Sequence, residues 1–259
     1  MKSVWITALA ENQPRAAAVS AHLKQYGLQC QGHFWQDAPE KLVWRAALNG
    51  LLEAKSDVWV ILADDVEIAK PSVRYGLSLM AAALRHAKGA GFQIVLLWNS
   101  PSPLPEKLPQ LLQQATVVEE AAASWAAKIV ARANMAGKAA APDYRLDIQG
   151  DERLGQWFEI GPREGLWQGV VLGVYGGGAE INFQAVGPQG VLPEKTTLEF
   201  AQQSLKIQVG SREFTAWAVR NEVASDMSYF ARIKGCPEAI LFMPYADDTD
   251  VSATVLRLQ

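Results

Sequence analysis

The stretches DVWVILA (57–63) and FQIVLLW (92–98) decide the fold class of the first half of this chain. Each is apolar at nearly every position, whereas a strand with one face in water alternates apolar and polar residues. Strands buried on both faces are typical of parallel sheets that helices cover on each side. The two stretches therefore predict buried strands of a parallel α/β sheet.

Outward from these stretches, the first half alternates strand-like and helix-like patterns. Three further apolar runs, at 3–8, 28–35 and 115–118, predict the remaining strands. Apolar residues at helical spacing predict helices at 14–26, 40–55 and 72–88. Together these patterns predict a doubly wound parallel five-stranded sheet over residues 1–135, with the flavodoxin-like strand order 2-1-3-4-5.

The second half has a different sequence pattern. Residues 136–144 (AGKAAAPDY) are small and end in a proline-containing segment, which predicts a linker. Residues 145–259 are expected to form a mostly antiparallel β domain, a sandwich or a barrel. Its predicted strands are 156–160, 169–175, 181–186, 205–209, 214–219, 229–233, 239–243 and 253–258. Gly176–Gly178 is expected to be a hairpin turn, and residues 197–203 are compatible with a short helix.

Bulk composition excludes several classes of function. Hydrophobic residues make up 49% of the chain and charged residues 20%, which is typical of globular proteins. The net charge of −3 gives no support for a nucleic-acid partner. Two cysteines, Cys30 and Cys236, are expected to be buried thiols. No apolar stretch approaches the length of a membrane span, so we expect no membrane partner and a cytoplasmic location.

Five segments of residues 1–85 carry a family resemblance. The opening strand VWIT (4–7) leads to a helix ending in KQYGL (24–28), and the aromatic strand that follows ends in the acid of HFWQD (33–37). Next come WRAALNGLLEAKSDVWVILADD (44–65) and KPSVRYGLSLMAAAL (70–84). In this order and spacing they resemble the TIR (Toll/interleukin-1 receptor) family, over about half of the chain. The resemblance implies self-association and, in bacteria, signalling or defence.

One position departs from the family pattern. TIR enzymes that cleave NAD place a glutamate on the third helix, and aligning VRYGL (73–77) with that segment puts Gly76 there. The related nucleoside deoxyribosyltransferase pattern puts Arg74 on its glutamate instead. Breaking an N-glycosidic bond passes through an oxocarbenium-like state, which a carboxylate stabilises or attacks. Neither glycine nor arginine can do so, and the resemblance therefore implies a module without the family's catalytic acid.

The candidate ligand site lies where the predicted strands end, since open α/β sheets bind ligands outside the carboxyl ends of their strands. NAD or another nucleotide is the ligand that the resemblance implies. The candidate ligand-binding residues are Thr7, Asn12, Asp37, Arg74, Tyr75, Trp98 and Asn99. Glu11, Asp64 and Asp65 are candidates for a displaced catalytic carboxylate. The opposing interpretation makes Asp64, Asp65 and Glu67 a solvated turn that caps the next helix, and makes Arg74 and Tyr75 a surface cation beside a half-buried ring.

Metal sites are not predicted. The three histidines show no metal-ligand spacing. The segment YADDTD (245–250) resembles a cation-binding loop only loosely, because it lacks the glycine and the distal glutamate of an EF-hand. Most tryptophans of the first half are expected in the core, and Trp35 and Trp98 are the two candidates for stacking on a ligand.

Three hypotheses for function follow. The first is a TIR-like interaction or ligand-sensing module without catalysis, whose β domain supplies a second binding surface for a protein partner. The second is an enzyme that cleaves the N-glycosidic bond of NAD or a nucleoside with a displaced carboxylate. The third is a structural accessory subunit.

Overall fold

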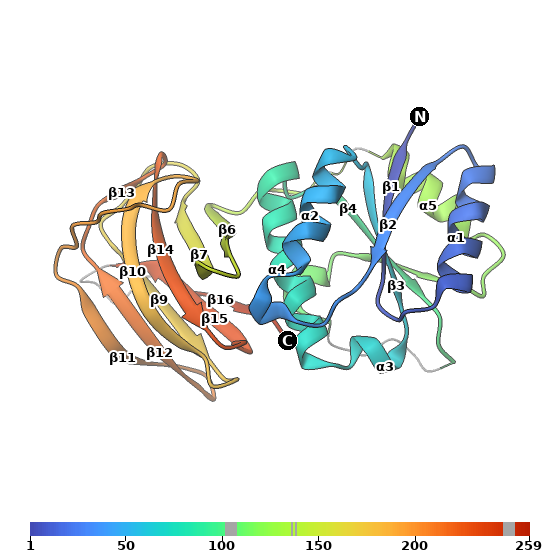
Figure 1. Cartoon of the computed structure of the whole chain (residues 1–259). Helices are drawn as coiled ribbons and strands as arrows, with labels where there is room; N and C mark the ends of the chain where they lie inside the picture. Colours follow the sequence, from blue (N-terminus) through green and yellow to red (C-terminus); the bar gives the residue numbers. More distant parts are fainter. Residues whose placement is uncertain (102–107, 136, 138, 246–251) are drawn as a thin grey trace. The chain divides into compact units, whose positions relative to one another are not determined.

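In the computed structural model, the described residues are 1–101, 108–135, 137, 139–245 and 252–259. They form two compact units, as the change of texture along the sequence predicts (Figure 1). The first unit comprises residues 1–39 and 43–141, and the second comprises residues 142–259 together with 40–42. No helix among the described residues is both long and apolar enough to cross a membrane.

The first unit is built on a parallel sheet of five strands in the order β2-β1-β3-β4-β5. This confirms the fold class predicted for the N-terminal half. The strands are β1 (Ser3–Ala8), β2 (Gln29–Phe34), β3 (Val58–Ala63), β4 (Gln93–Trp98) and β5 (Thr116–Glu119). β3 is buried at every position and β4 at all but its first, because both lie inside the sheet and both of their faces are covered.

Helices cover both faces of this sheet (Figure 1). α1 (Gln13–Gln25) and α5 (Trp125–Asn134) pack on one face, over an aliphatic core that includes Val60, Leu97 and Ile129. α2 (Trp44–Glu53) and α4 (Pro71–Lys88) lie on the other face, and the four-residue α3 (Asp65–Ile68) follows β3.

The predicted helix over 40–55 is wrong in its first part, and α5 was not predicted from periodicity. A short 3-10 turn at Pro39–Lys41 comes first, and α2 begins only at Trp44. Leu42 lies between them with a φ of 53°, in the left-handed region, which no helix accommodates. Another 3-10 turn, Gln110–Leu112, precedes β5.

The second unit contains two large antiparallel sheets and a small one. The four-stranded sheet has the order β10-β14-β7-β6, the five-stranded sheet has the order β11-β12-β9-β15-β16, and β8 pairs with β13. The strands are β6 (Tyr144–Asp151), β7 (Gly155–Pro162), β8 (Leu166–Trp167), β9 (Val170–Tyr175), β10 (Glu180–Pro188), β11 (Gln202–Val209), β12 (Arg212–Val219), β13 (Val223–Ala224), β14 (Met227–Lys234), β15 (Ala239–Pro244) and β16 (Thr254–Arg257). The rings of Tyr144 and Phe242 meet edge-on, 4.8 Å apart, and join the two large sheets.

Two local predictions for this unit are wrong. Residues 197–203 form no helix, since Phe200 has a φ of 47° and Gln202 already belongs to β11. Gly176–Gly178 is a turn but not a hairpin: it joins β9 of one sheet to β10 of the other. All three glycines have positive φ values, which glycine adopts without steric cost.

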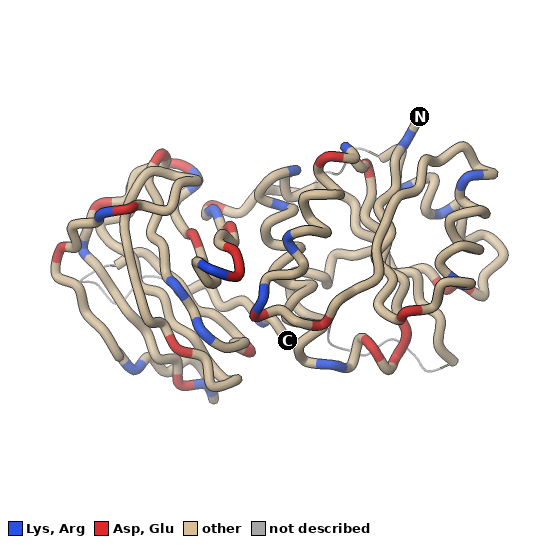
Figure 2. Tube along the Cα trace, in the orientation of Figure 1, with Lys and Arg blue, Asp and Glu red and all other residues tan. Residues whose placement is uncertain are grey.

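Charged side chains are interspersed over both units (Figure 2). Residues 1–137 carry 13 basic and 11 acidic side chains, a net charge of +2, and residues 138–259 carry 11 and 16, a net charge of −5. These values sum to the net charge of −3 for the chain. The acidic excess therefore belongs to the β-rich half.

Candidate functional site

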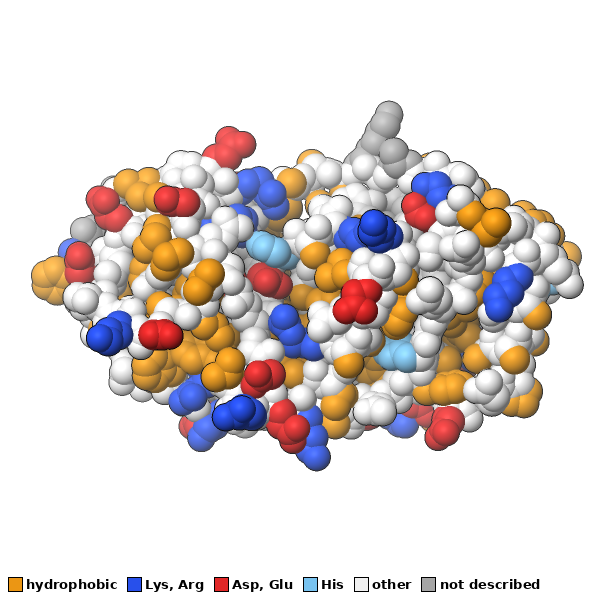
Figure 3. Space-filling model, turned by 45° about the horizontal axis from the view of Figure 1, so that its top comes forward, with side chains coloured by type: hydrophobic (Ala, Val, Ile, Leu, Met, Phe, Trp, Pro, Cys, Tyr) orange, Lys and Arg blue, Asp and Glu red, His pale blue; other side chains and the backbone are white. Residues whose placement is uncertain are grey.

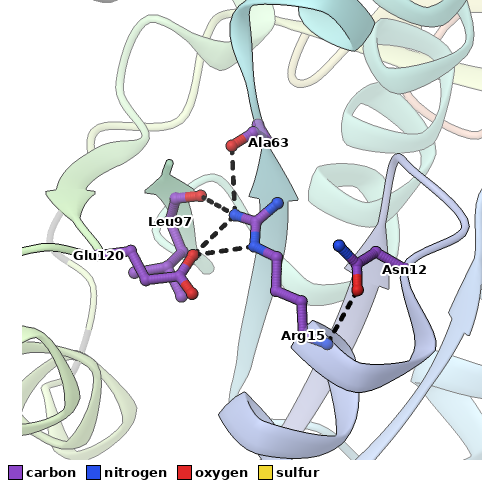
Figure 4. Close-up of polar contacts among 5 residues, drawn as sticks. All are labelled: Asn12, Arg15, Ala63, Leu97 and Glu120. Atoms are coloured by element: carbon purple, nitrogen blue, oxygen red, sulfur yellow. Dashed lines mark hydrogen bonds and ion pairs between the residues drawn. The ribbon is translucent and has the colours of Figure 1, made fainter. Parts of the chain in front are cut away.

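The carboxyl ends of β3 and β4 meet the side chain of Arg15, which lies in the first turn of α1 (Figure 4). Asn12 caps this helix by accepting a hydrogen bond from the backbone N–H of Arg15, 3.0 Å away. The Nη2 of Arg15 lies 3.3 Å from the carbonyl oxygen of Ala63 and 3.4 Å from that of Leu97. The cap and these carbonyls fix the guanidinium over the edge of the sheet.

Glu120, directly after β5, completes this arrangement. Its Oε2 accepts hydrogen bonds from Nη2 and Nε of Arg15, at 2.7 and 2.9 Å. The side chains are only 12% exposed for Arg15 and 20% exposed for Glu120, so solvent screens the ion pair less than it would a surface pair. An ion pair therefore covers part of the carboxyl edge of the sheet, outside which open α/β sheets bind their ligands.

Neither Arg15 nor Glu120 was among the residues predicted for the site. The rule that singles out residues after strand ends could have found Glu120, since it follows the predicted fifth strand. Arg15 carries no such signal, because its position depends on how α1 lies against the sheet.

Gly76, which the predicted alignment sets against the glutamate of TIR enzymes, is covered by an indole ring. A Cβ placed on Gly76 would lie 2.6 Å from Cζ2 and 3.2 Å from Cη2 of Trp35. Carbon atoms in contact are normally 3.5 Å or more apart, so even a methyl group would force Trp35 to move. A side chain at position 76 therefore fits only if the indole of Trp35 moves.

Thr7 lies in the core rather than in an open site. It is fully buried, and its Oγ1 accepts a hydrogen bond from the indole N–H of Trp59 at 2.8 Å. The same oxygen lies 2.9 Å from Nε2 of His33. The hydroxyl can donate its own proton to Nε2 when the imidazole is neutral, and burial lowers the pKa of His33, which favours that neutral form.

The candidate acids have separate positions. Asp64 caps α3 by accepting a hydrogen bond from the backbone N–H of Glu67 at 2.9 Å, as the opposing interpretation expects. Asp65 is the first residue of α3 and is half-buried, while Glu11 is exposed. Asp37 accepts a hydrogen bond of 2.7 Å from the hydroxyl of Ser72 and so joins the loop after β2 to α4.

The remaining candidates divide between core and surface. Tyr75 is fully buried rather than a half-buried surface ring, and Trp98 is 5% exposed at the end of β4. Arg74 is half-buried, and Asn99 is exposed with its backbone N–H bonded to Ala63 O at 3.0 Å. The candidates therefore do not converge on one pocket: Asn12 adjoins the Arg15–Glu120 pair, whereas Thr7, Tyr75 and Trp98 are packed in the protein interior.

No protein-family model matches this chain, and no curated protein does. The likeness to TIR domains therefore rests on the order and spacing of the quoted sequence motifs alone.

Within the described ranges, no three side chains of the metal-binding types are grouped so that they could hold an ion. The acids of the segment YADDTD, Asp247, Asp248 and Asp250, lie outside the described residues.

Proposed function

We propose that the first unit is a TIR-like interaction module that does not cleave NAD or nucleosides, and that the β-rich unit supplies a second binding surface. The observation that carries this proposal is the contact between Trp35 and Gly76. A glycosidase of this type needs a carboxylate beside the sugar. Here the atoms of an indole ring take up the space that such a side chain would need.

The Arg15–Glu120 ion pair is a second observation that supports the proposal. An anionic ligand at the carboxyl edge of the sheet would have to displace Glu120 from Arg15. It would also have to replace the hydrogen bonds that Arg15 donates to the carbonyl groups of Ala63 and Leu97. Removing one partner of a poorly exposed ion pair leaves the other charge without compensation, which opposes binding.

The remaining role is recognition of other molecules. The TIR resemblance implies self-association and, in bacteria, signalling or defence, and we propose this setting for the chain. Groups of hydrophobic side chains lie between charged ones on the face shown in Figure 3. A non-obligate interface has about the same apolar fraction as the rest of a protein surface, so a surface of this kind can accommodate a protein partner.

The test for catalysis uses the full chain incubated with NAD and with nucleosides, followed by chromatography of the products. We expect no release of nicotinamide or free base above the buffer control. Release that is lost on replacing Glu11, Asp64 or Asp65 by its amide would contradict the proposal and establish the alternative glycosidase with a displaced carboxylate.

The test for self-association is sedimentation velocity over a wide range of protein concentrations. We expect the average mass to rise with concentration. A chain that stays monomeric throughout would remove self-association from the proposal and leave only recognition of a different partner.

A further inference from the structure

The β-rich unit contains a groove of about 910 Å³ that the proposed role of the first unit does not involve. Small-molecule sites commonly measure about 300–1,000 Å³, so the groove is large enough for a ligand of several rings. The segment before β11 and the residues that follow β12 and β15 form much of its lining. The lining residues that matter here are Glu199, Phe200, Arg220, Asn221, Glu222 and Tyr245.

Phe200 is the most unusual of these residues. Its side chain is 77% exposed, although burial of a phenylalanine is worth about 1.5–3 kcal/mol. Its backbone has a φ of 47°, in the left-handed region that bulky residues rarely adopt. Fold stability explains neither feature, because the ring is not in the core and the backbone conformation is strained.

Hydrogen bonds hold the segment of Phe200 in place. The side-chain oxygen of Asn221 accepts from the backbone N–H of Glu199 at 2.9 Å, and its amide group donates to the carbonyl of Thr197 at 2.9 Å. The backbone N–H of Arg220 donates to the carbonyl of Glu199, also at 2.9 Å. These three hydrogen bonds fix the residues before Phe200 to the two residues that follow β12.

Arg220 positions the aromatic rings of the groove. Its guanidinium carbon lies 4.8 Å from the ring centroid of Tyr245 and 5.8 Å from that of Phe200. Its Nη2 also lies 3.3 Å from the hydroxyl oxygen of Tyr245. Because Arg220 contacts both rings, it helps to pre-organise an aromatic surface, which lowers the entropy lost on binding.

The charges and polar groups of the groove indicate the class of ligand. Glu199 and Glu222 outnumber Arg220, so the lining disfavours phosphate groups and hence nucleotides. Arg220 lies over one face of the Phe200 ring, and the 77% exposure of this residue leaves ring surface that attracts the weakly positive C–H groups of a sugar. The carboxylates of Glu199 and Glu222 offer acceptors for hydroxyl groups, and the amide of Gln168, also in the lining, offers both a donor and an acceptor. We propose that this groove binds a neutral oligosaccharide, independently of whether the first unit has any catalytic activity.

The test is saturation-transfer NMR on the full chain. The probes are oligosaccharides of glucose, mannose, galactose, xylose and N-acetylglucosamine, with ATP and a lysine-rich peptide for comparison. We expect transfer to at least one oligosaccharide, an affinity about tenfold lower in Phe200→Ala, and none of this loss in Phe183→Ala. Phe183 is a matched control because it is also exposed (47%) and also contacts an arginine, Arg232 at 5.7 Å, but lies outside the groove.

Phe200→Gly separates the ring from the backbone strain. Glycine accepts a φ of 47°, so this variant keeps the backbone conformation while removing the ring, and it should lose binding as Phe200→Ala does. Thermal unfolding checks that both variants fold. The proposal is overturned if no oligosaccharide binds, if the two Phe200 variants bind as the wild type does, or if ATP or the peptide binds in preference.

Discussion

The packing of Trp35 against position 76 requires a glycine there. We predict that Gly76→Ala destabilises the protein by about 1–3 kcal/mol, because the new methyl group overlaps the indole of Trp35. Helix propensity acts in the opposite direction, since alanine is favoured over glycine by about 1 kcal/mol within a helix. Urea unfolding of the two proteins measures the net effect.

The background Trp35→Leu provides the control for this substitution. With the indole removed, Gly76→Ala should cost much less or become stabilising, because only the propensity term remains. An equal cost in both backgrounds would show that the contact between Trp35 and Gly76 is not the cause.

Arg15 and Glu120 permit a second prediction at this scale. Arg15→Met should destabilise the protein by about 2 kcal/mol, because Glu120 loses its cation and the carbonyls of Ala63 and Leu97 lose a donor. The double variant Arg15→Met with Glu120→Leu should recover part of this loss. A single-variant loss below about 0.5 kcal/mol would mean that the pair behaves as an ordinary surface ion pair.

His33 makes stability depend on pH. Burial lowers its pKa from the ordinary value of 6.5, so the unfolded chain binds this proton more readily than the folded chain does. The contribution is absent well above pH 6.5, and stability falls as the pH drops from 6.5 towards the folded pKa. His33→Gln should flatten this slope in urea unfolding at a series of pH values. The same substitution at the exposed His86 should leave the slope in place.

At the scale of elements, Asp64 acts as a helix cap. Asp64→Ala should destabilise the protein by about 1 kcal/mol, because the backbone N–H of Glu67 loses its acceptor. Asp64→Asn keeps an oxygen acceptor and should cost much less. Thermal unfolding distinguishes the two, and equal losses would mean that the charge rather than the cap matters.

The strands of the parallel sheet could be predicted from sequence because a strand buried on both faces is apolar at nearly every position, and this pattern needs no knowledge of its neighbours. VWVILA and IVLLW reveal buried strands without knowledge of their neighbours. The limit appears at Gly176–Gly178. Its turn chemistry is local, but β9 pairs with β12 and β15 from far along the chain, so the segment connects two sheets.

At the scale of the whole molecule, the arrangement of the candidate site could not be predicted from sequence. Arg15 and Glu120 are 105 residues apart, and only the folded sheet with its helices brings them together. Trp35 was expected in the core or stacked on a ligand, but its contact with Gly76 depends on the position of α4. The alignment that sets Gly76 against the family's glutamate stays a prediction, and the ring that covers Gly76 could not be predicted from sequence.

The two cysteines provide a prediction for the whole chain. Cys30 and Cys236 are free thiols, half-buried rather than buried as predicted, and they belong to different compact units, so no disulfide bond contributes to stability. The thermal midpoint should therefore be the same with and without a reducing agent. A mobility difference between reduced and non-reduced samples on a denaturing gel would contradict this.

The indole beside Gly76 also has a consequence for evolutionary history. Exchanging Gly76 alone for glutamate would clash with the ring, and shrinking Trp35 first would remove the packing of a half-buried indole, which lowers stability. Both one-step intermediates are less stable than the starting protein, and most proteins have only about 5–15 kcal/mol to lose. A carboxylate at position 76 would therefore take two coordinated changes, one at Gly76 and one at Trp35.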